Sequence, residues 1–473
     1  MKGIVAVALL LLTGNRLLAQ HQEISEKPEM YKDQQIQSGD TTSLLSAFKR
    51  GRFNGHFRYF FMSTQNQEGL TDYYANAAGG GLRYETAEFH GFQFAVSGFY
   101  TFNIGSSDLG KLDSTTGQPN RYEIGLFDVE DPYNKKDIDR LEELFLKYNY
   151  RKSFIVFGKQ LINTPFINLQ DGRMRPTAVN GIWFESGEIK KAKIEGGWIY
   201  SISPRGATRW FDIGESVGLY PVGVNVDGTK SQYASNLHSK GIFLLGTHIE
   251  MGKHLTLHGW DVFTENIFNT AMLQADFSFR LKSNENIFTS VQIIRQDAVN
   301  NGGNEDAAKT YFEKGGKAIS FGAKAGWKNK QWETSINYNR ITADGRYLMP
   351  REWGRDPFFT FMPRERNEGF GDVHAIMGKV NYNIPKIRVK TSLAAGYYKL
   401  PDVKNYRLNK YGVPSYTQVN ADIRYSFAGM MKGLEAQLLV AGKMKSGETY
   451  HNKKFEFNKV DMMQANFVLN YHF

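Results

Sequence analysis

The last eleven residues of the chain, MQANFVLNYHF (463–473), decide the fold. Apolar and aromatic side chains occupy every second position from Met463 to Phe473, and polar side chains fill the positions between them, with Val468 as the exception. Because successive side chains of a strand point to opposite faces, this period of two predicts a β-strand that runs to the final residue.

The same alternation recurs throughout the chain. It is clearest in six segments, at residues 52–61, 273–282, 319–328, 332–339, 387–397 and 419–427. Each has one face rich in rings or aliphatic side chains and one polar face. A soluble sandwich also alternates, but its strands usually have only ~5–6 residues. Strands of about ten residues with one apolar face are typical of a barrel that faces lipid outside and a watery lumen inside.

Composition supports an all-β membrane protein. The 473 residues include 34 Phe and 25 Tyr but no Cys, which excludes disulfides, thiolate metal sites and a cysteine nucleophile. No stretch after residue 20 approaches the ~18–20 apolar residues of a membrane-spanning helix. We therefore expect a transmembrane antiparallel β-barrel with inward-folded loops and neither cofactor nor metal. At roughly 25 residues per strand and connection the chain suggests 16 to 18 strands, of which we favour eighteen.

The N-terminus predicts export. Lys2 precedes the apolar run GIVAVALLLL (3–12), and LLAQ (17–20) offers small residues for cleavage, so residues 1–20 are expected to be a signal peptide. Cleavage would remove two basic residues and no acid, which lowers the net charge from +10 to +8. An exported chain seldom meets nucleic acid, so we expect no such partner.

Two further segments complete the expected organisation. Residues 21–45 are polar and predict a flexible periplasmic extension, and residues 46–473 predict the barrel. A terminal strand that ends in an aromatic residue resembles the signal that the barrel assembly machinery reads, which makes Phe473 the expected contact. The expected location is the outer membrane of a Gram-negative bacterium, with lipid, lipopolysaccharide and small solutes as partners.

Two connections are too long to be turns. Residues 163–181 carry Arg173 and Arg175, and residues 344–372 carry five more arginines among prolines and rings. Long loops without secondary structure are usually functional or disordered. Because these two are rich in rings and poor in Ser and Gln, we expect them to fold into the mouth of the pore.

Basic side chains dominate the polar strand faces and these loops. The candidate residues along the solute path are Arg52, His56, Arg58, Arg173, Arg175, Arg280, Lys324, Arg388, Lys390 and Arg424. A wall of one charge sign concentrates solutes of the opposite sign, and guanidinium groups bind carboxylates in a bidentate manner. The lumen should therefore favour anionic or zwitterionic solutes such as amino acids, peptides or carboxylates. For a lysine near a strand end, contact with lipopolysaccharide phosphates is an equal alternative.

Other signals are weaker. His248, His254 and His258 have the same strand parity, but positions four apart on one strand lie ~13 Å apart, too far to share a metal ion, so solvated wall positions are favoured. No G-x-S-x-G or H-E-x-x-H motif appears, and we predict no enzyme. Two alternatives stay open: a barrel hydrolase of the outer membrane and a secreted β-rich carbohydrate-binding protein.

Three blocks of sequence carry a resemblance to a known family. They are GRFNGHFRYFFMS (51–63), the segment 146–198, and WGRDPFF (353–359) followed by DVHAIMGKVNYNI (372–384). Together they resemble the OprD family of outer-membrane porins, as a distant branch. The matching positions in the middle block are Gly158, Pro165, Arg173, Pro176, Gly181, Ser186 and Glu188.

The resemblance implies an 18-stranded barrel, monomeric or loosely trimeric, that is constricted by inward-folded loops. Members of the family pass small solutes, commonly basic amino acids, peptides or carboxylates, and a ladder of basic residues guides the carboxylate. Arg58 matches the first-strand arginine of the family, and Arg173 matches its loop arginine.

Overall fold

The computed structural model describes residues 41–473 except 171, 283 and 366. The described part contains one short α-helix, α3 (Leu44–Lys49), and nineteen strands. The strands are β1 (Arg52–Gln65), β2 (Tyr73–Glu85), β3 (Phe92–Asn103), β4 (Asp139–Tyr150), β5 (Ser153–Gln160), β6 (Ala178–Ser186), β7 (Ala192–Ser203), β8 (Phe211–Asp212), β9 (Ile242–Met251), β10 (Leu255–Thr264), β11 (Phe268–Lys282), β12 (Glu285–Ala298), β13 (Lys317–Lys328), β14 (Trp332–Ile341), β15 (Val373–Ile384), β16 (Val389–Lys399), β17 (Tyr416–Ser426), β18 (Leu434–Lys445) and β19 (Met462–His472). Five 3-10 turns, η2 (Glu123–Leu126), η3 (Ala307–Lys309), η4 (Pro385–Ile387), η5 (Gly429–Met431) and η6 (Lys453–Phe455), lie in the connections.

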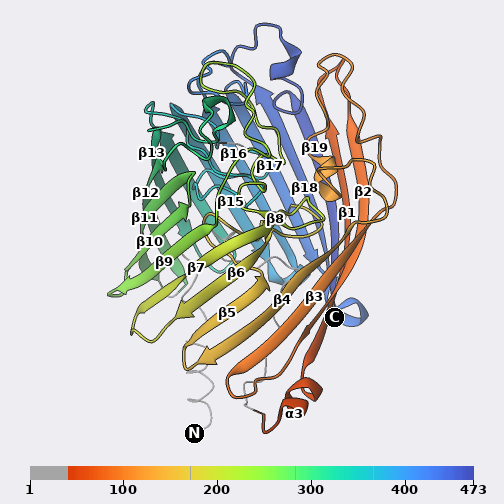
Figure 1. Ribbon diagram of the computed structural model, residues 1–473, viewed down its shortest axis with the longest axis vertical. Helices are drawn as coiled ribbons and strands as arrows, with labels where there is room; N and C mark the ends of the chain where they lie inside the picture. The colour runs from red at the N-terminus through yellow and green to blue at the C-terminus, as the bar shows by residue number, and fades with distance from the viewer. Residues whose placement is uncertain (1–40, 171, 283, 366) are drawn as a thin grey trace.

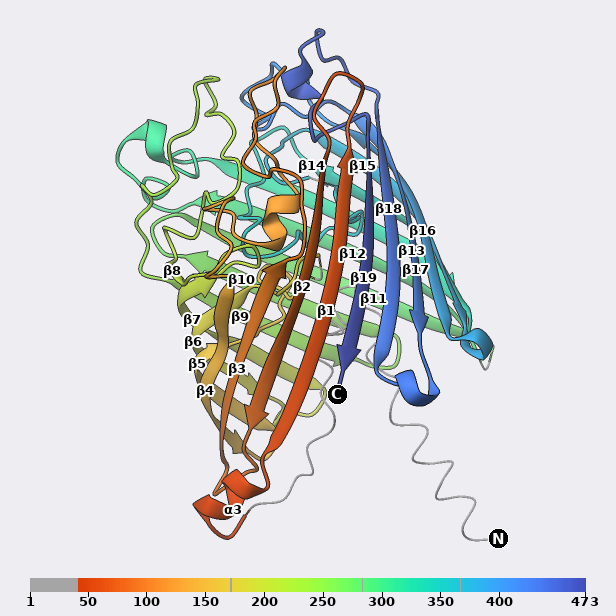
Figure 2. The same ribbon diagram turned by 90° about the vertical axis from the view of Figure 1, so that its right-hand side faces the viewer.

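The sheet closes on itself. β1 pairs with both β2 and β19, and each long strand is antiparallel to its neighbours (Figures 1 and 2). The two-residue β8 pairs only with the end of β7. The sheet continues from β7 directly to β9. Eighteen strands therefore form the barrel, as predicted. The predicted terminal strand is also confirmed, because the backbone N–H of Phe473 donates to the carbonyl of Gly55 at 3.0 Å.

The two ends of the barrel differ. One end, called the turn end, has short connections such as residues 151–152 and 329–331, and it carries α3 and the C-terminus (Figure 1). The opposite loop end has the long connections 104–138, 161–177, 204–241 and 342–372, with shorter loops at 299–316, 400–415 and 446–461. The sequence pattern predicted only two of these loops, at nearly the observed bounds. No α-helix within the described residues has the length and hydropathy to cross a membrane.

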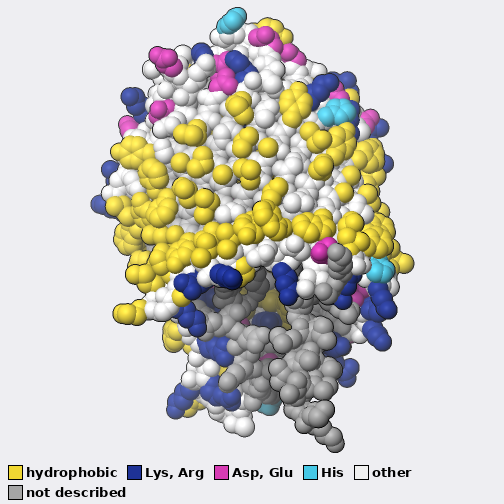
Figure 3. Space-filling view, turned by 180° about the vertical axis from the view of Figure 1, so that it is seen from behind, with side chains coloured by type: hydrophobic (Ala, Val, Ile, Leu, Met, Phe, Trp, Pro, Cys, Tyr) yellow, Lys and Arg dark blue, Asp and Glu magenta, His cyan; other side chains and the backbone are white. Residues whose placement is uncertain are grey.

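Strand alternation places one set of side chains outside and the other inside. On β1, Phe53 and Phe57 are 75% and 59% exposed, whereas Arg58 is 1% exposed. The same division holds on β11, where Leu273 points outward and Asp276 is buried inside. Figure 3 shows outward apolar side chains as a belt across the visible face of the barrel. This belt is the surface that the alternating pattern predicts for contact with lipid.

The interior at the loop end is packed rather than watery. Trp353 and Phe358 of the loop 342–372 are fully buried, together with inward-facing wall residues such as Trp260 and Tyr398. A second apolar cluster joins the loop 104–138 to Phe60 and neighbouring wall positions. The long loops therefore have an apolar core of their own inside the barrel, which fixes the polar side chains that they carry.

Two expectations need correction. The strand expected from Ile387 begins at Val389, because Pro385 has no N–H for the ladder and starts a 3-10 turn instead. Arg388 ends this turn with a φ of 54° and donates to the carbonyl of Ser426 at 3.2 Å, so it lies in a turn and not on the wall.

The end of the expected flexible extension is also held in place. The hydroxyl of Thr41 donates to the carbonyl of Glu88 at 2.8 Å, and α3 follows at Leu44. The rest of the extension and the expected signal peptide lie outside the described residues, so these two predictions stay untested.

Candidate functional site

The loop 342–372 crosses the lumen. Gln292 on β12 donates to the carbonyl of Pro357 at 3.2 Å, and Gln418 on β17 donates to that of Pro363 at 2.7 Å. Both glutamines point inward from strands that are far apart in the barrel. Both contacts lie inside the barrel, so the predicted inward fold of this loop is confirmed.

The loop 161–177 meets the first loop inside the barrel. The amide of Asn168 donates to the carbonyl of Arg355 at 3.1 Å, and the hydroxyl of Thr177 donates to that of Glu352 at 2.9 Å. The indole of Trp353 donates to Ser216 of the loop 204–241 at 2.9 Å. Three loops therefore hold one another across the lumen.

Three arginines from these three loops form what we call the arginine cluster: Arg173, Arg205 and Arg364. Each of Arg173 and Arg364 lies close enough to Arg205 for its charge to act on them. Arg173 passes so near Gly125 of η2 that a Cβ there would lie 2.4 Å from the Arg173 Nε. Glycine at this position therefore makes the approach of Arg173 possible.

Arg364 reaches the lumen face of β19. Its guanidinium donates to Gln464 and, at 3.2 Å, to Asn466, which both point inward from β19. Its Cζ lies 5.6 Å from the ring centroid of Tyr122, and Arg205 donates to Gln170. The guanidinium groups of Arg205 and Arg364 are therefore held by amide oxygens and an aromatic ring. None of these contacts neutralises their positive charge.

The cluster is electrostatically costly. Burial, followed by the charge of Arg205, lowers the pKa of Arg173 to about 10. Burial and the nearby Arg173 lower the pKa of Arg364 to about 9. Both arginines remain charged at neutral pH. Positive charges held together away from water attract an anion strongly.

Glu123 is the carboxylate whose charge acts on both Arg173 and Arg364. Burial raises its pKa, although Thr64 donates to it at 2.5 Å and Asn120 at 2.7 Å. Three guanidinium groups beside this carboxylate leave the cluster with an excess of positive charge.

Arg175 has a structural position. It is buried and donates weakly to the carbonyl of Ile138 at 3.4 Å, and burial together with Arg140 lowers its pKa to about 9. Arg140 on β4 pairs with Glu142 at 2.8 Å and donates to the carbonyl of Pro176 at 2.6 Å. Arg140 therefore anchors the loop base, and Arg175 is buried close to it.

Arg58 and His56 point inward from β1, where both side chains are buried. The Cζ of Arg58 lies 5.3 Å from the ring centroid of Phe60, and His56 stacks on His472 of β19 with centroids 4.7 Å apart. Arg58 lies six residues from Thr64, or about 20 Å along the strand toward the turn end. It is therefore a second basic position below the arginine cluster.

The remaining candidates lie toward the turn end. Lys324 points inward, with its Nζ 5.0 Å from the ring centroid of Phe288, and Arg424 pairs with Asp422 at 3.4 Å. Arg280 and Lys390 are exposed near strand ends, and Arg52 is half-buried at the start of β1. The predicted basic positions thus fall at several levels of the barrel. Arg173 lies beside two arginines, Arg205 and Arg364, that are not among the candidates along the solute path.

The sequence pattern missed acidic residues on the wall. A register shift opposite Ser97 and Gly98 turns both Glu142 and Glu143 inward. Glu143 accepts from Arg83 at 2.9 Å. A bulge of this kind re-aims side chains. The sequence signal of this bulge is the spacing of the outward residues Leu141 and Leu144. They lie three positions apart, whereas strict alternation would separate outward residues by an even number.

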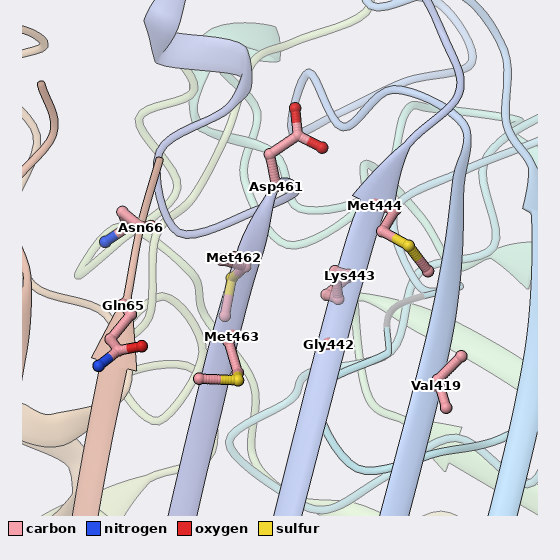
Figure 4. Close-up of a pocket in the computed structure, with 9 residues that line it drawn as sticks. All are labelled: Gln65, Asn66, Val419, Gly442, Lys443, Met444, Asp461, Met462 and Met463. Carbon is pink, nitrogen blue, oxygen red and sulfur yellow. The ribbon is translucent and has the colours of Figure 1, made fainter. Parts of the chain in front are cut away.

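A shallow groove lies on the outer wall at the loop end of β17, β18 and β19 (Figure 4). Its volume is about 390 Å³, and its apolar lining includes Val419, Met444 and Met463, all of which point outward. The groove therefore opens toward the lipid belt and not toward the lumen. No group of three or more His, Asp or Glu residues within the described ranges is arranged to hold a metal ion.

A family model for outer membrane porins of the OprD family matches residues 53–351, more than half of the chain. The chain belongs to the OprD family of outer-membrane porins. No curated protein matches the sequence. This OprD-family chain is a channel-type barrel of the Gram-negative outer membrane. Its turn end faces the periplasm and its loop end faces the exterior.

Solved porin structures share the fold at low identity. OccK9 (OpdG) of Pseudomonas aeruginosa has a TM-score of 0.69 at 14% identity, over 90% of this chain and 99% of that one. OpdK of the same organism, determined with vanillate, has a TM-score of 0.67 at 12% identity over the same shares. OccAB4 of Acinetobacter baumannii has a TM-score of 0.67 at 14% identity, over 89% and 98%.

Proposed function

We propose that this porin takes up small anionic or zwitterionic solutes that carry a carboxylate, and that the arginine cluster selects them. The observation that carries the proposal is the meeting of Arg173, Arg205 and Arg364 beside Glu123 in the lumen. A guanidinium fork matches a carboxylate in a bidentate geometry. The cluster would therefore replace part of the hydration shell of an entering carboxylate.

The geometry supports both the capture of a solute and its release. The Nε of Arg173 has no hydrogen-bond partner among the described residues, whereas the Arg364 guanidinium keeps its bonds to Gln464 and Asn466. A solute needs binding that is weak enough to leave, and Arg58 offers a next basic site about 20 Å further along β1. Lys324 and Lys390 continue the basic positions toward the periplasm.

Aromatic carboxylates are favoured candidates within this class. Vanillate, the compound named with the structure of OpdK, combines a ring with a carboxylate. Here the ring of Tyr122 lies beside Arg364, so a planar solute could stack on a ring while its carboxylate meets the guanidinium.

Contact with lipopolysaccharide, assembly through Phe473 and the monomeric or trimeric state remain predictions.

Liposome swelling tests the proposal. The panel would contain a benzoate, a neutral sugar and a primary amine of similar size. Faster entry of the carboxylate, lost in R173Q/R364Q, is expected. Equal entry of all three into wild-type liposomes would contradict the proposal. A hydrolase assay on the detergent-solubilised protein separates the channel from the barrel-hydrolase alternative.

The matched control is Arg295→Gln. Arg295 lies on the outward face of β12, where it pairs with Asp297 at 2.8 Å, and its side chain is 62% exposed. It has the same charge as the cluster residues but stands outside the lumen. R295Q should therefore leave the order of entry rates unchanged.

A further inference from the structure

Two histidines that were expected to be separate, solvated wall positions touch each other. His248 on β9 and His258 on β10 stand directly opposite in the strand register, and their Nδ1 atoms are 2.5 Å apart. The turn at residues 252–254 reverses the chain between them, so distance along one strand does not separate them. His254 lies in that turn, where its Nδ1 contacts the carbonyl of Ser278 at 2.9 Å.

The second nitrogen of each imidazole faces a carboxylate. His248 Nε2 lies 2.7 Å from Glu195 Oε1 of β7, and His258 Nε2 lies 2.9 Å from Asp276 Oδ2 of β11. The order Glu195, His248, His258, Asp276 therefore forms a chain of three contacts across four adjacent strands. We call these four residues the histidine array.

The contacts fix the number of protons. An imidazole nitrogen and an ionised carboxylate both accept hydrogen bonds, so each of the two Nε2 contacts needs one proton. Two bare Nδ1 lone pairs would repel at 2.5 Å, and two N–H groups would clash, so that contact needs one proton as well. The array thus holds three protons, whereas two neutral imidazoles supply only two.

The extra proton belongs to the array and not to one atom. It can be written on His248, on His258 or on a carboxyl oxygen, and the total is the same in each case. With one proton shared between the imidazoles, the two histidines together carry a charge of +1. Loss of that proton leaves two acceptors face to face and breaks the Nδ1 contact.

Other charged groups face the array. Lys193 on β7 contacts Glu195 at 3.1 Å and Glu185 on β6 at 2.7 Å. On the other side, Asp276 accepts from Gln274 and lies within electrostatic range of Lys324 on β13. Glu185, Glu195 and Asp276 outnumber Lys193 and Lys324 by one, so the shared proton offsets the remaining negative charge of this wall.

The array is accessible from the lumen. His258 and Asp276 are buried, but the side chain of His248 is 22% exposed and that of Lys193 is 43% exposed. Protons can therefore reach the array from the water of the channel without any change in the strands. The ring of Trp260 covers His248 edge-on with centroids 5.7 Å apart, which limits how far that imidazole can swing.

We propose that the histidine array is a proton-binding site of the channel wall whose occupancy modulates the charge selectivity of the pore. Release of the shared proton adds one negative charge to the wall formed by β6, β7, β9, β10 and β11. Binding of a further proton removes one. The anion preference should therefore fall as the pH rises and the array releases the shared proton.

Reversal potentials across planar bilayers test this proposal. A KCl gradient at low ionic strength would be applied at several pH values between about 5 and about 8. The wild-type potential should shift toward cation preference as the pH rises. The shift should disappear in H248Q/H258Q and persist in H254Q, whose histidine lies outside the array. An equal shift in wild type and H248Q/H258Q would overturn the proposal.

Nuclear magnetic resonance of the wild-type protein needs no variant to fold. With ¹⁵N-labelled histidine in detergent micelles, the shared proton should give one strongly deshielded resonance coupled to two Nδ1 atoms. Two neutral histidines without such a resonance at every pH would also overturn the proposal.

This inference is independent of the arginine cluster. A wild-type channel without anion preference at any pH would contradict the proposed function. It would leave the pH-dependent shift, and hence the histidine array, intact.

Discussion

Arg364 and Arg173 lie beside each other in the lumen although they belong to different loops. The Arg364 Nη1 is 3.8 Å from the position that a Cβ on Gly172 would take, and the charge of Arg173 contributes to the lowered pKa of Arg364. Two like charges are held together only where the surrounding structure fixes both. Here the apolar core of the loops fixes them, and the resulting excess of positive charge is what a carboxylate would neutralise.

Gly125→Ala should weaken anion selectivity without unfolding the barrel. A methyl group at this position would lie 2.4 Å from Arg173 Nε, so the flexible guanidinium has to move away. The expected result is a lower ratio of anion to cation permeability in bilayers. G105A is the matched control, since Gly105 lies in the same loop with open space around its Cβ position. An unchanged ratio in G125A would show that the position of Arg173 is unimportant.

Glu123→Gln should act in the opposite direction. The buried carboxylate partly offsets the charges of Arg173 and Arg364, and its removal leaves them less compensated. The permeability ratio measured in the same bilayers should therefore move toward anions. A shift of the permeability ratio toward cations would contradict the role of Glu123 in offsetting the charges of Arg173 and Arg364.

Arg140→Met should destabilise the barrel by about 3–5 kcal/mol, because it leaves the buried Glu142 without the Arg140 charge. Arg140 is fully buried and its ion pair with Glu142 measures 2.8 Å. The temperature at which the folded form disappears on a heat-modifiability gel should fall. R140M/E142Q should recover part of the loss, since it removes both charges. Full stability of R140M would contradict the structural role of Arg140.

Lys410 predicts a pH dependence of stability. Burial lowers its pKa from 10.5 to about 7, and its Nζ lies 4.5 Å from the ring centroids of Tyr233 and Tyr311. Between pH 7 and 10.5 the unfolded chain binds the proton that the folded protein has released. Stability should therefore rise with pH across this window, by about 1.4 kcal/mol per unit.

Thermal unfolding in detergent at several pH values checks the prediction for Lys410. K410M has no titrating amine, so its stability should lose this part of the slope while the aromatic surroundings stay filled. A wild-type stability that is flat or falls between pH 7 and 10.5 would contradict the lowered pKa.

The strands could be predicted because their cause is local. On β19 and β1 every second side chain meets lipid, so the alternation that ends at Phe473 appears directly in the sequence. Arg388 was misplaced because parity alone extended the strand through the turn that Pro385 begins. Pro385 was the available signal for that boundary.

The sites could be predicted only in part because their contacts are not local. Arg173 stood out within its loop, but its proximity to Arg205 and Arg364 depends on how three loops pack inside the barrel. His248 and His258 were within reach of the sequence. A hairpin centred on residues 252–254 places them opposite each other, whereas spacing along a single strand does not.

The most direct test of the arginine cluster is the reversal potential in a KCl gradient across planar bilayers. Wild type and R295Q should both prefer anions, and R173Q/R364Q should lose most of that preference while its conductance and heat-modifiability persist. A cation-selective wild type, or an unaltered potential in R173Q/R364Q, would contradict the assignment of solute selection to these arginines.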